Sequence, residues 1–145
     1  MAKRKKRESV KGRSGLTFNH AMVYVRKVTR ALEFYKGLLG FRLIEQYRGG
    51  NFPGYARLQS PRVRTTLALH ELERGHTLAK TSSIRLYFEV KDLDRLCKKL
   101  AAGAEISQMP QVMPWGWKHA YLKDPDGHEL SLYWAGVKRF RKTVG

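Results

Sequence analysis

The sequence contains a single cysteine, Cys97, in 145 residues. One cysteine excludes both an intrachain disulfide framework and a cysteine-rich zinc site. Cys97 lies in a helical pattern beside Leu96 and Leu100, which predicts a buried thiol rather than a nucleophile. A chain without disulfides suits a reducing compartment, so we expect the protein in the cytoplasm.

Long apolar runs are also absent. No stretch approaches the roughly 20 apolar residues that a membrane-spanning helix needs, and the charged N-terminus lacks the apolar segment of a secretory signal. With 42% hydrophobic residues the chain is nevertheless long enough to bury a core. These features predict one globular domain that does not enter a membrane.

Acidic residues are scarce: 12 Asp and Glu stand against 29 Lys and Arg, a net charge of +17. Residues 1–15 carry seven basic residues and one acid, and residues 136–145 carry four basic residues and no acid, so +7 remains on residues 16–135. Because blocks of like charge repel one another, we expect a disordered basic tail at 1–15, one folded domain at 16–135 and a basic tail at 136–145. The tails either solubilise the chain or contact nucleic acid non-specifically.

Several common motifs of catalysis and binding are missing. The sequence has no P-loop, no dinucleotide-binding glycine pattern, no nucleophile elbow and no convincing Ser/His/Asp arrangement. It also has no signature of an RNA-recognition or helix-turn-helix module. The last absence argues against sequence-specific recognition of nucleic acid.

The domain contains an internal repeat. Hydrophobic periodicity predicts a strand, a helix and three further strands within residues 16–74, and the same order within residues 83–135. The first helix is predicted to end at Gly40 and the second at Gly103. Two βαβββ units must each bury one sheet face, which predicts an α+β fold with a curved mixed sheet around a central cleft.

Both ends of this domain resemble a known family. NHAMVYVRKVTRALEFYKGLLGF resembles the first strand and helix of the vicinal oxygen chelate superfamily, the glyoxalase/bleomycin resistance protein/dioxygenase-like proteins. PWGWKHAYLKDPDGHELSLYW resembles its closing segment, in which Asp-Pro-Asp-Gly precedes the last strand. The resemblance covers residues 17–135 and implies the paired βαβββ fold.

The resemblance also implies a range of chemistry. The superfamily includes glyoxalase I, fosfomycin-resistance enzymes, extradiol dioxygenases, methylmalonyl-CoA epimerases and bleomycin-binding proteins. Its metal-dependent members hold a divalent cation that stabilises enolate or oxyanion charge on the bound substrate. If this chain is an enzyme, the resemblance implies lyase-, isomerase- or dioxygenase-like chemistry on a small molecule.

The residues at the family's metal-ligand positions depart from its pattern. His20 matches the first position, but the other three fall on Ala68, Arg85 and Ser131. Alanine has no donor atom, serine is a poor neutral ligand, and arginine carries a fixed positive charge. We therefore expect no metal cofactor. The alternative is a Zn, Ni, Mn or Fe ion that lies one pleat away from the family's position and binds His20, His70 and Glu129.

Strand alternation predicts what lines the cleft. The repeat makes His20 equivalent to Arg85 and Ala68 equivalent to Ser131. Arginine supplies a forked cation and rings supply stacking area, which suits a small anionic or aromatic molecule. His20 is a candidate general base, and Arg85 is a candidate oxyanion or anion partner. The predicted ligand-binding residues are His20, Tyr24, Ala68, His70, Arg85, Tyr87, Trp115, Trp117, Ser131 and Tyr133.

A structural interpretation of some of these residues stays open. Arg85 can instead pair with Glu89 or another acid around a filled core, and the two tryptophans can belong to the core or to a dimer contact. The stretch 124–127, Asp-Pro-Asp-Gly, predicts a tight turn rather than a cluster of catalytic acids. His119 and His128, which flank it, are expected in surface or turn roles.

The sequence leaves three functions open. The first is a metal-independent, glyoxalase- or bleomycin-resistance-like protein that binds a small molecule. The second is a metal-dependent lyase, transferase or dioxygenase of the same superfamily with displaced ligands. The third is a nucleic-acid-associated module that acts through its basic tails. Since relatives with one pair of repeats commonly dimerise, a homodimer is also expected.

Overall fold

The structure, a computed structural model, describes residues 15, 18–50, 52–79 and 84–136, so the two predicted tails lie almost wholly outside the described residues. The elements follow one order twice: strand, helix and three strands, as predicted. In the first repeat they are β1 (His20–Val25), α2 (Val28–Leu32) with its π-helical continuation η1 (Glu33–Leu38), β2 (Arg42–Gly49), β3 (Phe52–Gln59) and β4 (Thr66–Glu71). In the second they are β5 (Leu86–Glu89), α3 (Leu93–Leu100), β6 (Glu105–Val112), β7 (Lys118–Lys123) and β8 (Glu129–Trp134).

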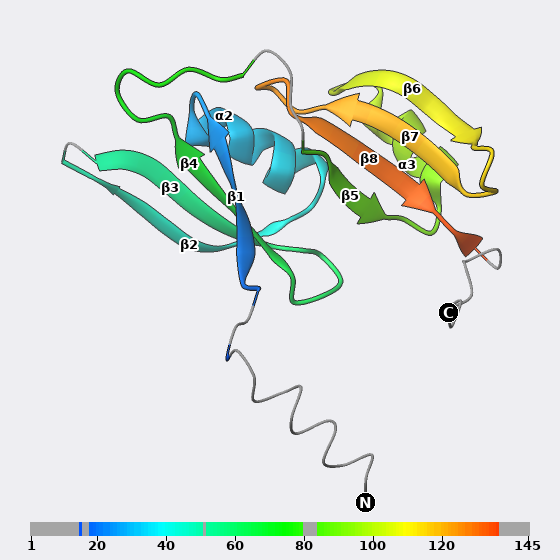
Figure 1. The fold of residues 1–145 in the computed structure, drawn as a ribbon, viewed down its shortest axis with the longest axis horizontal. Coiled ribbons are helices and arrows are strands. Elements are labelled where there is room, and N and C mark those ends of the chain that lie inside the picture. Colours follow the sequence, from blue (N-terminus) through cyan, green and yellow to red (C-terminus); the bar gives the residue numbers. More distant parts are fainter. Residues whose placement is uncertain (1–14, 16–17, 51, 80–83, 137–145) are drawn as a thin grey trace, which may run out of the picture.

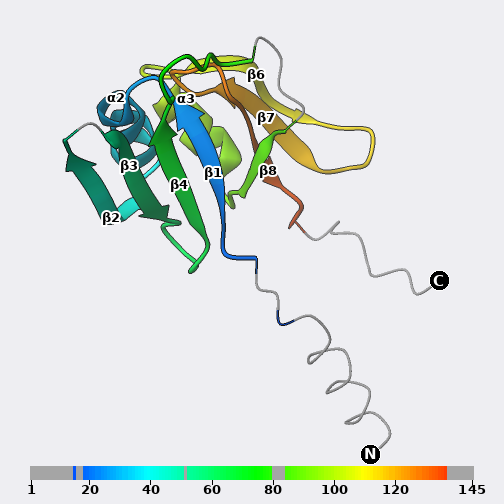
Figure 2. The same cartoon turned by 60° about the vertical axis from the view of Figure 1, so that its left-hand side comes forward.

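Each repeat forms its own four-stranded sheet. The strand orders are β1-β4-β3-β2 and β5-β8-β7-β6, which are the same order in the two repeats. The first and last strands of each repeat pair in parallel, and the remaining pairs are antiparallel. Figure 1 shows the two sheets side by side, and Figure 2 shows the first sheet with its strands in sequence from β2 to β1. The predicted paired βαβββ fold is confirmed.

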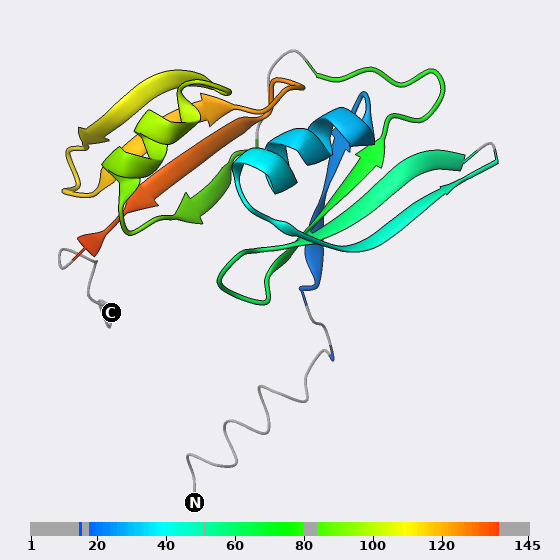
Figure 3. The same ribbon diagram turned by 180° about the vertical axis from the view of Figure 1, so that it is seen from behind.

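The helices of both repeats lie on the same side of the two sheets (Figure 3). Leu67 and Leu69 of β4 pack toward this side and are buried in the core, whereas Ala68 and His70 alternate with them and point to the other face. One apolar core joins both repeats, and Phe41 meets Phe88 across them at 5.6 Å between ring centroids. The face without helices is called the open face. Its side chains include His20, Met22, Tyr24, Tyr47, Tyr55, Arg57, Ala68 and His70 in the first sheet, and Arg85, Tyr87, His119, Tyr121, Glu129, Ser131 and Tyr133 in the second.

The helices end and pack as their sequences indicate, with one difference. Gly40 has a φ of +78°, the left-handed conformation that ends the first helix as predicted. The α3 helix ends at Leu100, before the predicted stop at Gly103. Cys97 is 1% exposed on the apolar face of α3, and burial raises the pKa of its thiol, with a smaller contribution from Asp94. The prediction of a buried thiol is confirmed.

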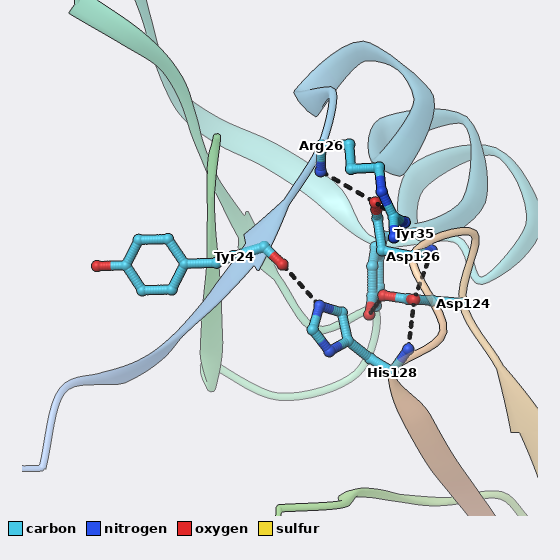
Figure 4. Close-up of polar contacts among 6 residues, drawn as sticks. All are labelled: Tyr24, Arg26, Tyr35, Asp124, Asp126 and His128. Atoms are coloured by element: carbon cyan, nitrogen blue, oxygen red, sulfur yellow. Dashed lines mark hydrogen bonds and ion pairs between the residues drawn. The ribbon is translucent and has the colours of Figure 1, made fainter. Parts of the chain in front are cut away.

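The Asp-Pro-Asp-Gly turn holds the two repeats together (Figure 4). Asp124 is 4% exposed, and its Oδ2 accepts a 2.7 Å hydrogen bond from the hydroxyl of Tyr35 in η1. Its Oδ1 accepts from the backbone N–H groups of Asp126 and His128, each at 2.9 Å. Burial, followed by the nearby Asp124 carboxylate, raises the pKa of Tyr35 far above its ordinary value, so the phenol stays protonated as the donor.

Two further contacts tie this turn to β1. Asp126 Oδ1 accepts from the backbone N–H of Arg26 at 2.9 Å, and the Nε2 of His128 lies 2.6 Å from the carbonyl oxygen of Tyr24. Gly127 has a φ of +88°, as the turn requires. The turn and the predicted turn role of His128 are therefore confirmed, and the acids of this stretch are structural. Among the described residues, no helix combines the length and apolarity that crossing a bilayer requires.

Candidate functional site

The open face of the second sheet carries a floor of three near-parallel rings. Trp117, His119 and Tyr133 come from the loop before β7, from β7 and from β8, where His119 and Tyr133 are cross-strand partners. The plane of His119 lies 11° from that of Trp117 and 19° from that of Tyr133, with centroids 6.4 and 5.4 Å away. Trp117 and Tyr133 differ by 10° at 5.5 Å. Alternation along the two strands places His119 and Tyr133 on one face, and Trp117 stacks with both, so this face carries a cluster of stacked rings, called the floor.

Two further rings stand upright against this floor. Trp115 is tilted 79° from His119 at 5.4 Å, and Tyr87 of β5 is tilted 87° from it at 6.3 Å. Both are open to solvent, with Trp115 43% and Tyr87 55% exposed. The space beside these rings is open to solvent and has a volume of about 350 Å³. This aromatic pocket is lined by Tyr87, Trp115, Trp117, His119 and Tyr133.

Hydrogen bonds fix the protonation state of His119 at the centre of the pocket. Its Nε2 accepts from the indole Nε1–H of Trp115 at 3.2 Å, so that nitrogen carries no proton. The Nδ1–H therefore donates to the hydroxyl of Ser131, 2.9 Å away and fully buried. Burial lowers the pKa of His119, and the positive charge of Arg85 lowers it further. The imidazole is thus held neutral, with both nitrogens engaged.

This arrangement predicts a specific pH dependence of stability. Because the pKa of His119 is lower in the folded than in the unfolded state, where it is near 6.5, the unfolded chain takes up the proton first as the pH falls. Neutral His119 makes its full contribution to the free energy of unfolding above pH 6.5. This contribution is lost as the pH falls from there toward the folded-state pKa. In urea unfolding, the wild type is expected to lose more stability between pH 7.5 and 5.5 than His119→Gln, which does not titrate. Equal losses in the two proteins would contradict this assignment.

Arg85 is paired with an acid beside the pocket. Its Nε and Nη2 donate to Glu129 Oε2 at 3.1 and 2.8 Å, and its guanidinium lies 4.7 Å from the centre of the Tyr121 ring. Arg85 directly precedes β5, whose register starts with Leu86 opposite Leu130, so Arg85 lies beside Glu129, the first residue of β8. The structural alternative for Arg85 is therefore present, with Glu129 as the acid rather than Glu89. Its predicted role as an anion partner requires an incoming anion to compete with this carboxylate.

The remaining predicted residues lie on the first sheet. The Nδ1 of His20 is 2.6 Å from the side-chain oxygen of Asn19, and the Nδ1 of His70 is 2.6 Å from the backbone oxygen of Glu71. Ala68 is fully buried between its neighbours. The predicted site is thus divided: His20, Tyr24, Ala68 and His70 belong to the first sheet, whereas Arg85, Tyr87, Trp115, Trp117, Ser131 and Tyr133 belong to the second.

A second cavity of about 380 Å³ lies where the two repeats meet. Met22 and Tyr24 of β1 form one side, and Glu129 lies opposite, at the start of β8. The connector before β5 supplies Leu72 and Leu78. Neither His20 nor Arg85 is among the lining residues of this cavity or of the aromatic pocket.

The residues present do not fit the divalent metal that the fold family implies. Of its ligand positions, Ser131 is bonded to His119, Arg85 is a cation, and Ala68 has no donor. The displaced set fails as well, because His20 pairs with Thr66 whereas His70 lies four residues further along β4, about 13 Å away. Within the described ranges, no group of three or more His, Cys, Asp or Glu side chains is suited to a metal ion.

The prediction of a surface or turn role for His119 was wrong. Its side chain is 4% exposed and organises the aromatic pocket. The signal was present in the alternation of KHAYLK, which places His119 and Tyr121 on the open face beside Ser131 and Tyr133. In the sequence His119 lies close to the turn at 124–127, but in the structure it belongs to the strand before that turn, β7.

Comparisons with known proteins agree with this fold. The family model described as "Glyoxalase/Bleomycin resistance protein/Dioxygenase superfamily" matches residues 17–132. Glyoxalase I of Saccharomyces cerevisiae is 28% identical over an alignment that covers 89% of this chain and 46% of that protein. The chain therefore spans about half the length of this curated relative.

Two solved structures illustrate the similarity of fold. A member of the glyoxalase/bleomycin resistance protein/dioxygenase superfamily from Sphaerobacter thermophilus has a TM-score of 0.70 at 24% identity, covering 83% of this chain and 98% of its own. TnmS3, an antibiotic binding protein from Streptomyces sp. CB03234, has a TM-score of 0.65 at 24% identity, covering 82% and 96%. At these identities the likeness concerns the fold alone.

Proposed function

Because the chain belongs to the glyoxalase/bleomycin resistance protein/dioxygenase superfamily, we propose that it binds a small, planar aromatic molecule in the aromatic pocket of its second sheet. The observation that carries this proposal is the floor of three near-parallel rings with two upright rings beside it. A flat ligand stacks on the exposed face of a ring in this cluster and meets the upright rings at its edge, which are the two favourable geometries for aromatic pairs.

The size of the pocket supports a ligand of one to three rings. A volume of about 350 Å³ falls at the lower end of the range of small-molecule sites. The name of one relative in fold, the antibiotic binding protein TnmS3, is consistent with binding as the function of such a site. Binding is also favoured over acid–base turnover in this pocket, since both nitrogens of His119 are engaged.

The electrostatics favour rings over charge as the basis of recognition. Arg85 is neutralised by Glu129 at 2.8 Å, so a carboxylate on the ligand gains little from it. Both side chains are partly exposed to solvent, which weakens the field at the pocket further. We therefore propose that an aromatic compound binds without a metal, and that a negative charge on it is not required.

A calorimetric titration of chelator-treated protein tests this. A panel of one- to three-ring aromatic carboxylates and their neutral amides is expected to contain binders, with each acid and its amide differing less than fivefold. Arg85→Leu is expected to change the affinity of a neutral binder less than threefold. Loss of binding in chelator-treated protein, or abolition of neutral-ligand binding by Arg85→Leu, would contradict the proposal. The homodimer stays a prediction, to be checked by light scattering.

A further inference from the structure

The excess positive charge of the folded part lies entirely in the first repeat. Residues 18–79 contain ten Lys and Arg against four Asp and Glu, a formal charge of +6. Residues 84–136 contain seven of each, a formal charge of zero. The two sheets have the same topology, so this asymmetry is not a requirement of the fold. It gives the first repeat an attraction for polyanions that the second repeat lacks.

One row of cross-strand neighbours on the open face of the first sheet consists of rings. The pairing registers align Tyr47, Tyr55, His70 and Tyr24, one from each of the four strands. The centroid of His70 lies 5.4 Å from that of Tyr24 and 6.5 Å from that of Tyr55. Tyr24 is 42% and Tyr47 52% exposed, so both ends of the row have ring surface open to solvent.

The ring of Tyr24 points outward from an anchored backbone. Figure 4 shows it pointing away from the turn that joins the repeats, while its backbone oxygen is held by His128. His70 is oriented in the same way by its own strand, through the contact of Nδ1 with the oxygen of Glu71. The backbone of Tyr24 and the ring of His70 are therefore restrained before any partner binds, which lowers the entropy cost of binding.

The adjacent row on the same face carries a cation. Arg57 lies there, paired across the strands with Glu45 and Ala68. Its Nη2 donates to Asn19 and, at 3.4 Å, to Thr66, and its Nη1 lies 4.0 Å from the exposed Glu45 carboxylate. Its Nε–H is buried without a hydrogen-bond partner among the described residues. Rows on one face of a strand are about 7 Å apart. A base lying on the ring row would bring its phosphate within reach of this guanidinium.

More cations surround the end of the sheet at which β1 begins. The turn between β3 and β4 carries the exposed Arg62 and Arg64, and Arg42 starts β2 at the same end. A chain of phosphates that crosses the sheet therefore meets positive charge along its path.

We propose that the open face of the first sheet binds single-stranded nucleic acid, with unpaired bases on the rings of Tyr24 and Tyr47 and phosphates against Arg57, Arg62 and Arg64. Stacking requires bases that are not already paired, which selects single strands over duplexes. Every base has a flat face, so no sequence signature is needed. The surface is separate from the aromatic pocket, and this inference does not depend on the proposed function.

Fluorescence anisotropy with the full chain and a labelled 12-nucleotide oligouridylate tests the inference. The double variant Tyr24→Leu/Tyr47→Leu is expected to weaken binding at least tenfold, because stacking is lost at both positions. Tyr24→Phe/Tyr47→Phe keeps both rings and is expected to bind within twofold of the wild type. Trp115→Ala removes an equally exposed ring from the second sheet and is expected to have no effect on this binding.

A matched pair of charge variants distinguishes binding at the first sheet from a general effect of the net charge of the protein. Arg62→Ala/Arg64→Ala and Lys98→Ala/Lys99→Ala each remove two exposed cations, one pair beside the first sheet and the other on α3. Only the first is expected to weaken binding and reduce its salt dependence. The inference is overturned if the leucine double variant binds within twofold of the wild type, or if duplex RNA of the same length binds as tightly as the single strand.

Discussion

Replacement of Asp124 by alanine is expected to lower the free energy of unfolding by about 3 kcal/mol and the melting temperature by about 10 °C. The carboxylate accepts three hydrogen bonds in a buried position, from the Tyr35 hydroxyl and the backbone of Asp126 and His128. Alanine removes all three and leaves the Tyr35 hydroxyl buried without an acceptor. Chemical denaturation followed by circular dichroism measures the change.

Variants of graded severity identify which contacts matter. Asp124→Asn keeps the oxygen that accepts from the two backbone groups. Its free energy of unfolding is therefore expected to lie between that of the wild type and that of Asp124→Ala. Asp94→Ala is the control, since its carboxylate is exposed and pairs with Lys118 on the surface; it is expected to cost under about 1 kcal/mol. A loss for Asp124→Ala no larger than that of the control would show that the turn does not hold the repeats together.

Replacement of Trp117 by leucine is expected to weaken binding of any planar aromatic ligand by about 30-fold, equivalent to about 2 kcal/mol. Trp117 forms one end of the ring floor, and leucine retains apolar contact but no flat surface. A few well-packed aromatic residues commonly carry most of the energy of a binding site. Isothermal titration of the strongest binder from the aromatic panel measures the change.

The first sheet supplies the control for this prediction. Tyr47→Leu removes an exposed ring at a site remote from the pocket, and the affinity for the aromatic ligand is expected to stay within twofold of the wild type. Trp117→Phe retains a smaller ring and is expected to recover part of the affinity. If Trp117→Leu and Tyr47→Leu have the same effect, the ligand does not bind on the floor of rings.

The elements and faces of this fold follow from periodicity that is visible in the sequence. Leu67 and Leu69 alternate with Ala68 and His70, so one face of β4 is apolar and the other carries the functional side chains. The repeat then sets the equivalence of the two sheets, since each unit leaves one face to be covered by its own helix. These relationships are local, and for this reason they were predictable.

The composition of the site was less predictable because it depends on contacts between strands distant in sequence. Arg85 meets Glu129 across 44 residues, and no local pattern distinguishes that partner from Glu89. His119 becomes central only when β7 is paired with β8 and Trp115 folds back over it. The repeat also suggested one shared cleft, whereas the predicted residues are divided between two separate sheets.

Indole ¹H–¹⁵N resonances of the isotope-labelled protein test the central claim most directly. The three tryptophans report on different places: Trp115 and Trp117 belong to the aromatic pocket, and Trp134 ends β8. Titration of chelator-treated protein with the aromatic panel is expected to shift the Trp115 and Trp117 signals saturably and to leave that of Trp134 unchanged. If the Trp115 and Trp117 signals do not shift at millimolar concentrations of any compound in the panel, the account is contradicted.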